Sequence, residues 1–438
     1  MADLFVYGYI KPTVITYIVN TQDNYTIHIT MKNAHYLIIF SIVCSCLLSC
    51  NKNTSNRSKK TKEKLENFAD FASGISVFDY NLEAAADNDS VIFINEIADS
   101  IQYLPLEFDR EAALLTEFLM LFEWQEKIFI SSYSSRYFPG ICQFDKEGNF
   151  EQVAVKVGRG HSELTKGFYK WSYDESSCEL VVCGNGRIFN YSLLQEEGDF
   201  IPFSTYSHNA VALGKGHYAI LNMSFEHPGS TDIPYLQILN EKGRVVKSYY
   251  YSQKRTIFYR LPQSSCGPLE SYKLYQSYNG DAMFKDVFND TIFVVNKDSV
   301  SPSYCLYSGE KSPRVEDATK KEKKKSCVYI KKISDTKRYI ISTYTHSDCN
   351  KTVIFDRTSG EVAANASVLI SNHSAGVYPT RNRHFAVLKT PDDRDIYIGI
   401  VSTAENIIYA VASPGDVAAF VPGVTSESNP VIIKIYLK

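Results

Sequence analysis

A hairpin pattern recurs along the chain and restricts the possible folds more than any other feature. In each copy a strand-like segment runs into a polar turn that opens on Asp or Asn, closes on Gly and leads into a new strand. The Asx side chain bonds to the turn backbone, and Gly accepts a positive φ. Three copies end at Gly148, Gly243 and Gly360, and a looser copy ends at Gly198.

The spacing of these hairpins predicts a repeat architecture. Gly148 and Gly198 are 50 residues apart, Gly198 and Gly243 are 45 apart, and the 117 residues from Gly243 to Gly360 accommodate two further units with insertions. A period of about 40–50 residues with several strands per unit is typical of a β-propeller blade. Residues 90–438 hold six or seven such units. The alternative is a pair of β-sandwiches that share turn types.

Composition supports an all-β body. Tyr (31) and Phe (25) supply nearly all of the 13% aromatic residues, and short Val/Ile/aromatic segments alternate with turns. The best helix candidate, residues 110–119, is short, so doubly wound α/β folds are excluded. We expect the first strand, within residues 90–106, to pair with the last strand at 431–437 and so close the ring.

The N-terminal region resembles an export signal. Lys32 follows Met31, and a 14-residue apolar stretch (36–49) is shorter than the ~20 residues of a membrane span. Leu-Leu-Ser before Cys50 resembles a bacterial lipobox, so we expect Cys50 to be lipidated; an ordinary signal peptide is the alternative. The expected organisation is an over-called extension at 1–30, a lipoprotein signal peptide at 31–50, a flexible polar tether at 51–75 and a six-bladed β-propeller at 76–438.

Six segments in order resemble the six-bladed β-propeller lipoproteins of Bacteroides-type bacteria. The resemblance implies an all-β propeller of four-stranded antiparallel blades, and a lipid-anchored location in the envelope of a Gram-negative bacterium, facing the periplasm or the cell surface. It implies no established reaction. At one segment the sequence departs from the family, where His161-Ser162 replaces Pro-Gly. The matching segments are residues 97–107, 141–148, 157–163, 288–294, 303–309 and 429–438.

The strongest local candidate for a ligand site is the segment Gly-Arg-Gly-His-Ser-Glu at 158–163. Its glycines let backbone N–H groups approach a ligand, and Arg159 can form paired hydrogen bonds with a carboxylate or phosphate. His161 and Glu163 could bind or transfer protons, and Trp171 could stack on a sugar. The alternatives are a blade link with Glu163 pairing Arg159 at the surface, and a Trp171 that packs inside a blade.

Catalytic and metal-binding motifs are absent from the sequence, and seven body cysteines show no C-x-x-C spacing. We expect those cysteines to be small buried residues, with one or two disulfides possible. The net charge of -3 disfavours nucleic acid as a partner. We therefore expect a non-enzymatic module without a cofactor, bound to the membrane through its lipid and binding a glycan, peptide or envelope protein at one propeller face. The alternatives are a glycan-active hydrolase or lyase and a structural subunit of an envelope complex.

Overall fold

The computed structural model divides the chain into two compact units, Met1–Lys64 and Leu65–Lys438. In the first unit, β1 (Val6–Lys11), β2 (Val14–Asn20) and β3 (Thr26–Met31) form an antiparallel sheet. All of this sheet except Met31 falls within residues 1–30, the expected over-called extension. Cys50 and the expected tether lie outside the described residues, which are 6–11, 14–20, 26–31, 78–108, 115, 118–132, 140–158, 160, 163–164, 170–184, 186–203, 207, 209–221, 236–249, 273–285, 289–314, 326–347, 349–369 and 384–438.

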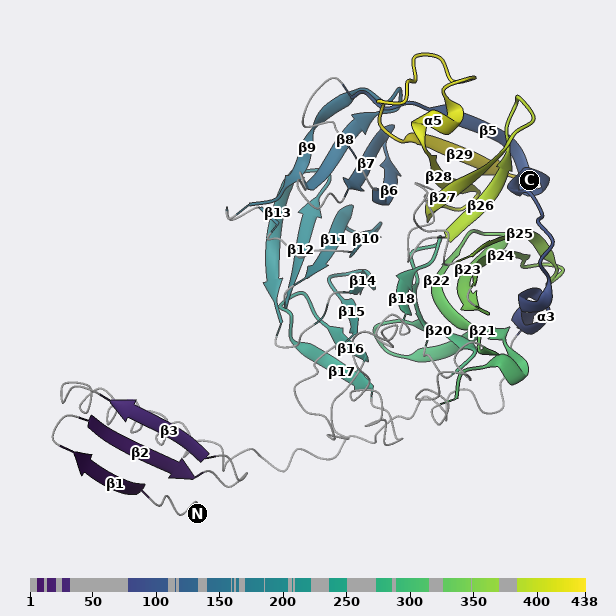
Figure 1. The fold of residues 1–438 in the computed structure, drawn as a ribbon. Helices are drawn as coiled ribbons and strands as arrows, with labels where there is room; N and C mark the ends of the chain where they lie inside the picture. The colour runs from purple at the N-terminus through teal and green to yellow at the C-terminus, as the bar shows by residue number, and fades with distance from the viewer. Residues whose placement is uncertain are drawn as a thin grey trace. The chain divides into compact units, whose positions relative to one another are not determined.

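The second unit is a six-bladed β-propeller built of small antiparallel sheets (Figure 1), as the hairpin spacing predicted. The sandwich alternative is thereby excluded. Two sheets gain a fifth strand, and the parallel one is β4 (Phe78–Asn81), which lies beside β21 in the fourth blade. The first five blades contain β6 (Phe118–Trp124), β7 (Lys127–Ser132), β8 (Gly140–Asp145) and β9 (Phe150–Lys156); β10 (Lys170–Asp174), β11 (Glu179–Gly184), β12 (Arg187–Ser192) and β13 (Glu197–Pro202); β14 (Ala210–Ala212), β15 (Tyr218–Leu221), β16 (Leu236–Leu239) and β17 (Val245–Tyr249); β18 (Lys273–Gln276), β19 (Ala282–Lys285), β20 (Thr291–Val295) and β21 (Val300–Tyr307); β22 (Tyr329–Asp335), β23 (Tyr339–His346), β24 (Cys349–Asp356) and β25 (Val362–Leu369).

The last blade takes strands from both ends of the propeller unit. Its sheet has the order β26 (His384–Lys389), β27 (Asp395–Thr403), β28 (Ile407–Ala412), β29 (Val431–Leu437) and β5 (Ala98–Leu104). β5 pairs antiparallel with β29, with Tyr103 opposite Ile433. The predicted ring closure is confirmed.

β27, rather than β26, is the inner strand of this blade. The inner strands β6, β10, β14, β18 and β22 contact one another in order, and β27 contacts both β22 and β6. The β27–β28 turn also meets the first turn of the fifth blade, where Lys337 pairs with Glu405 at 2.7 Å. β27, β28, β29 and β5 are therefore the four blade strands, and β26 is an added strand that packs against β23, β24 and β25.

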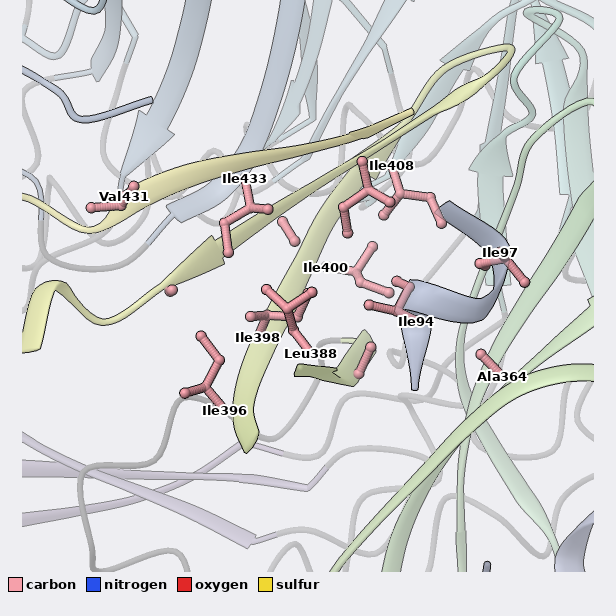
Figure 2. Packing of buried hydrophobic residues seen from close by; sticks show 14 of the residues in the cluster. Ile94, Ile97, Ala364, Leu388, Ile396, Ile398, Ile400, Ile408, Val431 and Ile433 are labelled. Atoms are coloured by element: carbon pink, nitrogen blue, oxygen red, sulfur yellow. The ribbon is translucent and has the colours of Figure 1, made fainter. Parts of the chain in front are cut away.

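Apolar packing between neighbouring blades forms the core, because a propeller has no single central core. The cluster at the closure joins Leu388 of β26, Ile398 of β27 and Ile433 of β29 to Ile94 and Ile97 of the 3-10 helix η2 (Ile94–Ile97) (Figure 2). Burying one such side chain contributes about 1.5–3 kcal/mol, so this cluster outweighs any single hydrogen bond at the seam.

Three of the four predicted hairpin turns have the expected chemistry. Gly148, Gly243 and Gly360 have positive φ values of 91°, 68° and 75°. Asp145 Oδ1 accepts from the backbone of Glu147 and Asn149, and equivalent Asx bonds open the other two turns.

The prediction for Gly198 is wrong. Glu196 takes the positive φ of 56° in that turn, and Gly198 lies within β13. A Cβ on Gly198 would lie 2.1 Å from the ring of Phe189 on the neighbouring strand β12. The glycine is needed there for ring packing.

The region expected to form a helix also differs. Residues 118–119 belong to β6, while most of residues 110–117 lie outside the described part of the chain. The aromatic residues of β6 favour a strand and outweigh the weak helical pattern.

Six cysteines fall within the described residues, and no disulfide joins any two of these six. Cys142, Cys183 and Cys327 are buried, and the other three are half-buried. Burial raises the pKa of Cys142 and of Cys183 to about 12, so both thiols stay protonated at neutral pH. They behave as the small buried residues that sequence analysis expected.

Gly148→Ala should destabilise the propeller more than Gly423→Ala does. Both glycines have positive φ, which costs a non-glycine residue about 1–2 kcal/mol. Only at Gly148 would the new Cβ also meet a backbone atom, Pro105 O at 2.2 Å, whereas nothing lies within 4 Å of a Cβ on Gly423. Urea unfolding of the two variants measures the difference, and equal losses would contradict the close approach.

Candidate functional site

The two ends of the propeller differ in the length of their connections. Antiparallel strands place successive connections at alternate ends. In the first five blades, the turns joining first to second and third to fourth strands contain two to five residues; we call this the turn end. The opposite end, the loop end, carries the connections between blades and between second and third strands, and these reach 23 residues at 250–272.

A side-chain amide bridges two inner strands at the turn end. Gln276, the last residue of β18, accepts a hydrogen bond from the Tyr173 backbone N–H at 2.8 Å and donates one to the Tyr173 carbonyl. The bridge joins the fourth blade to the second, and the third blade between them has an inner strand, β14, of only three residues. A single side chain thus joins the inner strands of the second and fourth blades at the turn end.

The predicted glycine-rich site lies at the loop end, in the connection from β9 to β10. Glu163 Oε2 accepts a hydrogen bond from the Gly160 N–H at 2.7 Å. A Cβ on Gly158 or Gly160 would overlap this carboxylate, since it would lie 1.9 or 2.9 Å from its atoms. The chain's own carboxylate therefore occupies the backbone where sequence analysis placed an external ligand. Arg159 and His161 lie outside the described residues, so their ligand-binding role and the Arg159–Glu163 pair stay predictions.

Trp171 lies inside the seam between the first and second blades. Its side chain is 6% exposed, and its ring meets that of Phe122 edge-on at 6.2 Å. The indole N–H has no acceptor among the described residues. In this conformation neither face of the indole ring is open to a sugar. The environment is that of a tryptophan packed inside the propeller, the alternative given in the sequence analysis.

A buried carboxylate that sequence analysis missed joins the fourth and fifth blades. Asp335, which is fully buried, accepts bonds from the Ser277 hydroxyl at 2.8 and 2.9 Å and from the Tyr278 N–H at 3.1 Å. Arg357 Nη2 approaches its Oδ2 at 2.5 Å. The Arg357 guanidinium also lies over the rings of Tyr278 and Tyr304, 5.7 Å from each.

Burial dominates the electrostatics of this network. It raises the pKa of Asp335, against the opposing effect of Arg357 and of the donors from Ser277 and Tyr278. Burial also raises the pKa of Tyr275 and of Tyr304, whose hydroxyls share a hydrogen bond of 2.7 Å. The hydrogen-bond partners of Asp335 described above come from the protein itself, so the network functions as a polar link between blades. No local motif marks these residues.

His384 is a second buried polar group, at the start of β26. It is fully buried, with Nδ1 2.8 Å from the Thr343 hydroxyl and Nε2 2.9 Å from the Ser334 hydroxyl. Burial, and then the nearby Lys332 ammonium, hold the pKa of His384 well below 6.5. The neutral ring fixes β26 to the fifth blade.

The acidic pair at 392–393 is engaged in a turn. The Thr390 hydroxyl donates to Asp392 at 2.6 Å, and this bond lowers the pKa of Asp392, so the carboxylate stays ionised. Asp393 pairs with Lys389 at 3.1 Å. Within the described ranges, no group of three or more His, Cys, Asp or Glu is placed to hold a metal ion. No helix in those ranges is long and apolar enough to cross a membrane.

The fold and the two unequal ends define a six-bladed β-propeller. A model of a "Domain of unknown function (DUF4934)" matches residues 77–436, and the chain belongs to that family. Among curated protein sequences, none matches significantly.

Solved structures share the fold at low sequence identity. A protein of Bacteroides fragilis described as exported is 14% identical, with a TM-score of 0.60 over 83% of this chain and 100% of its own. A catalytically inactive virginiamycin B lyase from Staphylococcus aureus, solved with quinupristin, is 9% identical, with a TM-score of 0.38 over 77% of this chain and 99% of its own. The first similarity shows the fold alone, and the second is too weak to support a functional argument.

Stability should fall as the pH drops below about 6.5, in part because of His384. In the unfolded chain this histidine binds a proton below about pH 6.5, whereas in the folded chain its lowered pKa keeps it neutral. The free energy of unfolding therefore falls by up to about 1.4 kcal/mol per pH unit. His384→Gln should flatten this dependence between pH 7.5 and 5.5 in denaturant titrations. An unaltered slope in His384→Gln would contradict the assignment.

Proposed function

We propose that the protein is a non-enzymatic binding module of the cell envelope that takes a glycan, a peptide or a partner protein at the loop end of its propeller. The observation that carries this proposal is the contrast between the two ends. The turn end consists of short, internally bonded turns, which leave little chain to form a recognition surface, and the Gln276 side chain joins two of its blades. The loop end carries the long connections, and long loops on a rigid scaffold are where binding residues concentrate.

Lipid anchoring at Cys50 is the second part of the proposal. It rests on the lipobox-like sequence, on the apolar stretch too short to span a membrane, and on the exported B. fragilis protein with the same fold. A lipid on Cys50 would attach the propeller to a membrane through the polar stretch that follows.

A glycan-active enzyme is the alternative, and no specific observation favours it. Glycan hydrolysis uses paired carboxylates, but the adjacent acids Asp392 and Asp393 are engaged by Thr390 and Lys389 within a turn. Glu196 holds a positive-φ turn position. The binding reading therefore remains the proposal.

Ligand binding should depend on the loop end and be indifferent to the turn end. Glycan-array and pull-down measurements on the purified full-length protein in detergent should detect a saturable ligand, and Arg159→Ala or His161→Ala should weaken it about tenfold or more, equivalent to about 1.4 kcal/mol. Lys242→Ala, an exposed cation in the β16–β17 turn, is the matched control. An equal loss of affinity in all three variants, or a loss only in Lys242→Ala, would contradict the loop-end assignment.

Cys50→Ser should release the protein from membranes. Without the thiol no thioether to a diacylglyceryl group can form, so the variant should move to the soluble fraction or remain an unprocessed precursor. Mass spectrometry of the N-terminal peptide would show the acyl mass only in the parent protein. Cys46→Ser is the control within the same apolar stretch and should keep both the lipid and the membrane fraction; a parent protein without lipid would refute the anchor.

A further inference from the structure

Residues 78–97, here called the N-terminal strap, cross the outside of the last three blades before the chain enters β5 (Figure 1). β4 pairs in parallel with β21 of the fourth blade. The short helix α3 (Leu82–Asp87) follows, and Ile92 then forms an antiparallel bridge to Asn365 in β25 of the fifth blade. η2 completes the strap against β25 and β26.

An aromatic anchor holds the start of the strap. Tyr80 is 3% exposed, with its ring 5.7 Å from that of Tyr304 and 5.6 Å from that of Phe355. Leu82 and Ala86 of α3 are buried in the same cluster. A buried aromatic side chain in a preformed pocket is the usual energetic centre of a docked segment.

The charges of the strap and of the surface beneath it are complementary. The strap contains five carboxylates and no Lys or Arg. Lys311 Nζ lies 2.5 Å from Asp87 Oδ2, and Lys351 Nζ donates to the Ala86 carbonyl and to Asp89 Oδ1, each at 2.6 Å.

Lys351 is the critical cation of this pair. Its side chain is 7% exposed, whereas that of Asp89 is 83% exposed. The strap supplies both of the oxygen partners of Lys351 Nζ given above. A cation that is covered by an occupant needs such partners, because a buried unpaired ammonium is costly, so the surface favours an acidic occupant.

We propose that the strap is a displaceable intramolecular ligand and that the surface beneath it is a docking site for an acidic segment with an aromatic anchor. This strap site is formed by β21, η6 (Gly309–Lys311), Lys351 and Phe355. It combines strand addition to β21 with the capture of a short acidic helical turn, two established modes of peptide recognition. Because β5 and η2 close the ring separately, residues 78–90 of the strap can leave while the six blades remain joined.

The chemistry of a competing partner follows from the strap itself. Its segment would present an aromatic residue in extended backbone, an apolar residue two positions later and carboxylates at the spacing of Glu83, Asp87 and Asp89. The Glu83 carboxylate accepts a hydrogen bond from the Glu310 N–H at 3.0 Å, so the first acid is recognised by a backbone donor.

The test uses the full chain with a specific protease sequence inserted between Ser90 and Val91, where the strap is exposed. After cleavage, a fluorescent synthetic peptide of residues 77–90 is added and its anisotropy is followed. We expect saturable binding, competition with the cleaved N-terminal fragment, and an unchanged thermal transition of the propeller. Peptides carrying Tyr80→Ala or the pair Asp87→Asn and Asp89→Asn should bind at least tenfold more weakly, while a Ser90→Ala peptide should bind like the parent.

A protein-side variant checks the cation directly. Lys351→Met should weaken peptide binding, and Lys337→Met, which removes the partner of Glu405 at the turn end, should not. If Lys351→Met fails to fold, the peptide variants still decide the question. A fragment that never exchanges, a propeller that unfolds when the fragment leaves, or equal binding by the acidic and neutral peptides would each overturn the proposal.

Discussion

The pairing of β5 with β29 is the interaction on which the rest of the structure depends. A propeller blade buries its faces only against its neighbours, so an open ring would leave two blade faces and one strand edge in water. Here the edge of β29 is paired by a strand that lies before the first blade in the sequence. The apolar cluster between Ile94, Ile97, Leu388, Ile398 and Ile433 covers the same seam (Figure 2).

Neighbouring blades are held in register by close backbone contacts at their outer edges. Gly148 lies against the Pro105 carbonyl just beyond β5, and Gly243 lies against the Pro202 carbonyl at the end of β13. The repetition shows that β5 occupies the position of an outer blade strand. A polar link also joins the fourth and fifth blades, because Asp335 forms an ion pair with Arg357 and accepts a hydrogen bond from Ser277 of the neighbouring blade. A rigid ring of this kind can carry variable loops at one end without loss of the scaffold.

Local chemistry explains why much of the fold could be predicted from the sequence. An Asx residue and a glycine specify a turn within five residues, so the hairpins at Gly148, Gly243 and Gly360 could be predicted. The spacing of these hairpins then indicated propeller blades. Gly198 was misread because its role depends on the Phe189 ring across the sheet. The strap, β26 and the Asp335 network escaped prediction because each depends on residues distant in sequence. The candidate site could be predicted only in part, for the same reason. The sequence does not show that Trp171 is buried between two blades. Nor does it show that the Glu163 carboxylate bonds to the backbone of Gly160.

Two truncated chains test the central claim of ring closure most directly. One begins at residue 91 and keeps η2 and β5 without β4 and α3; the other begins at residue 108 and lacks all four elements. Thermal unfolding and light scattering should show a single cooperative transition of a monomer for the first chain. The second should lose that transition or associate through the bare edge of β29. Equal transition temperatures and equal monomer fractions in the two chains would contradict the account.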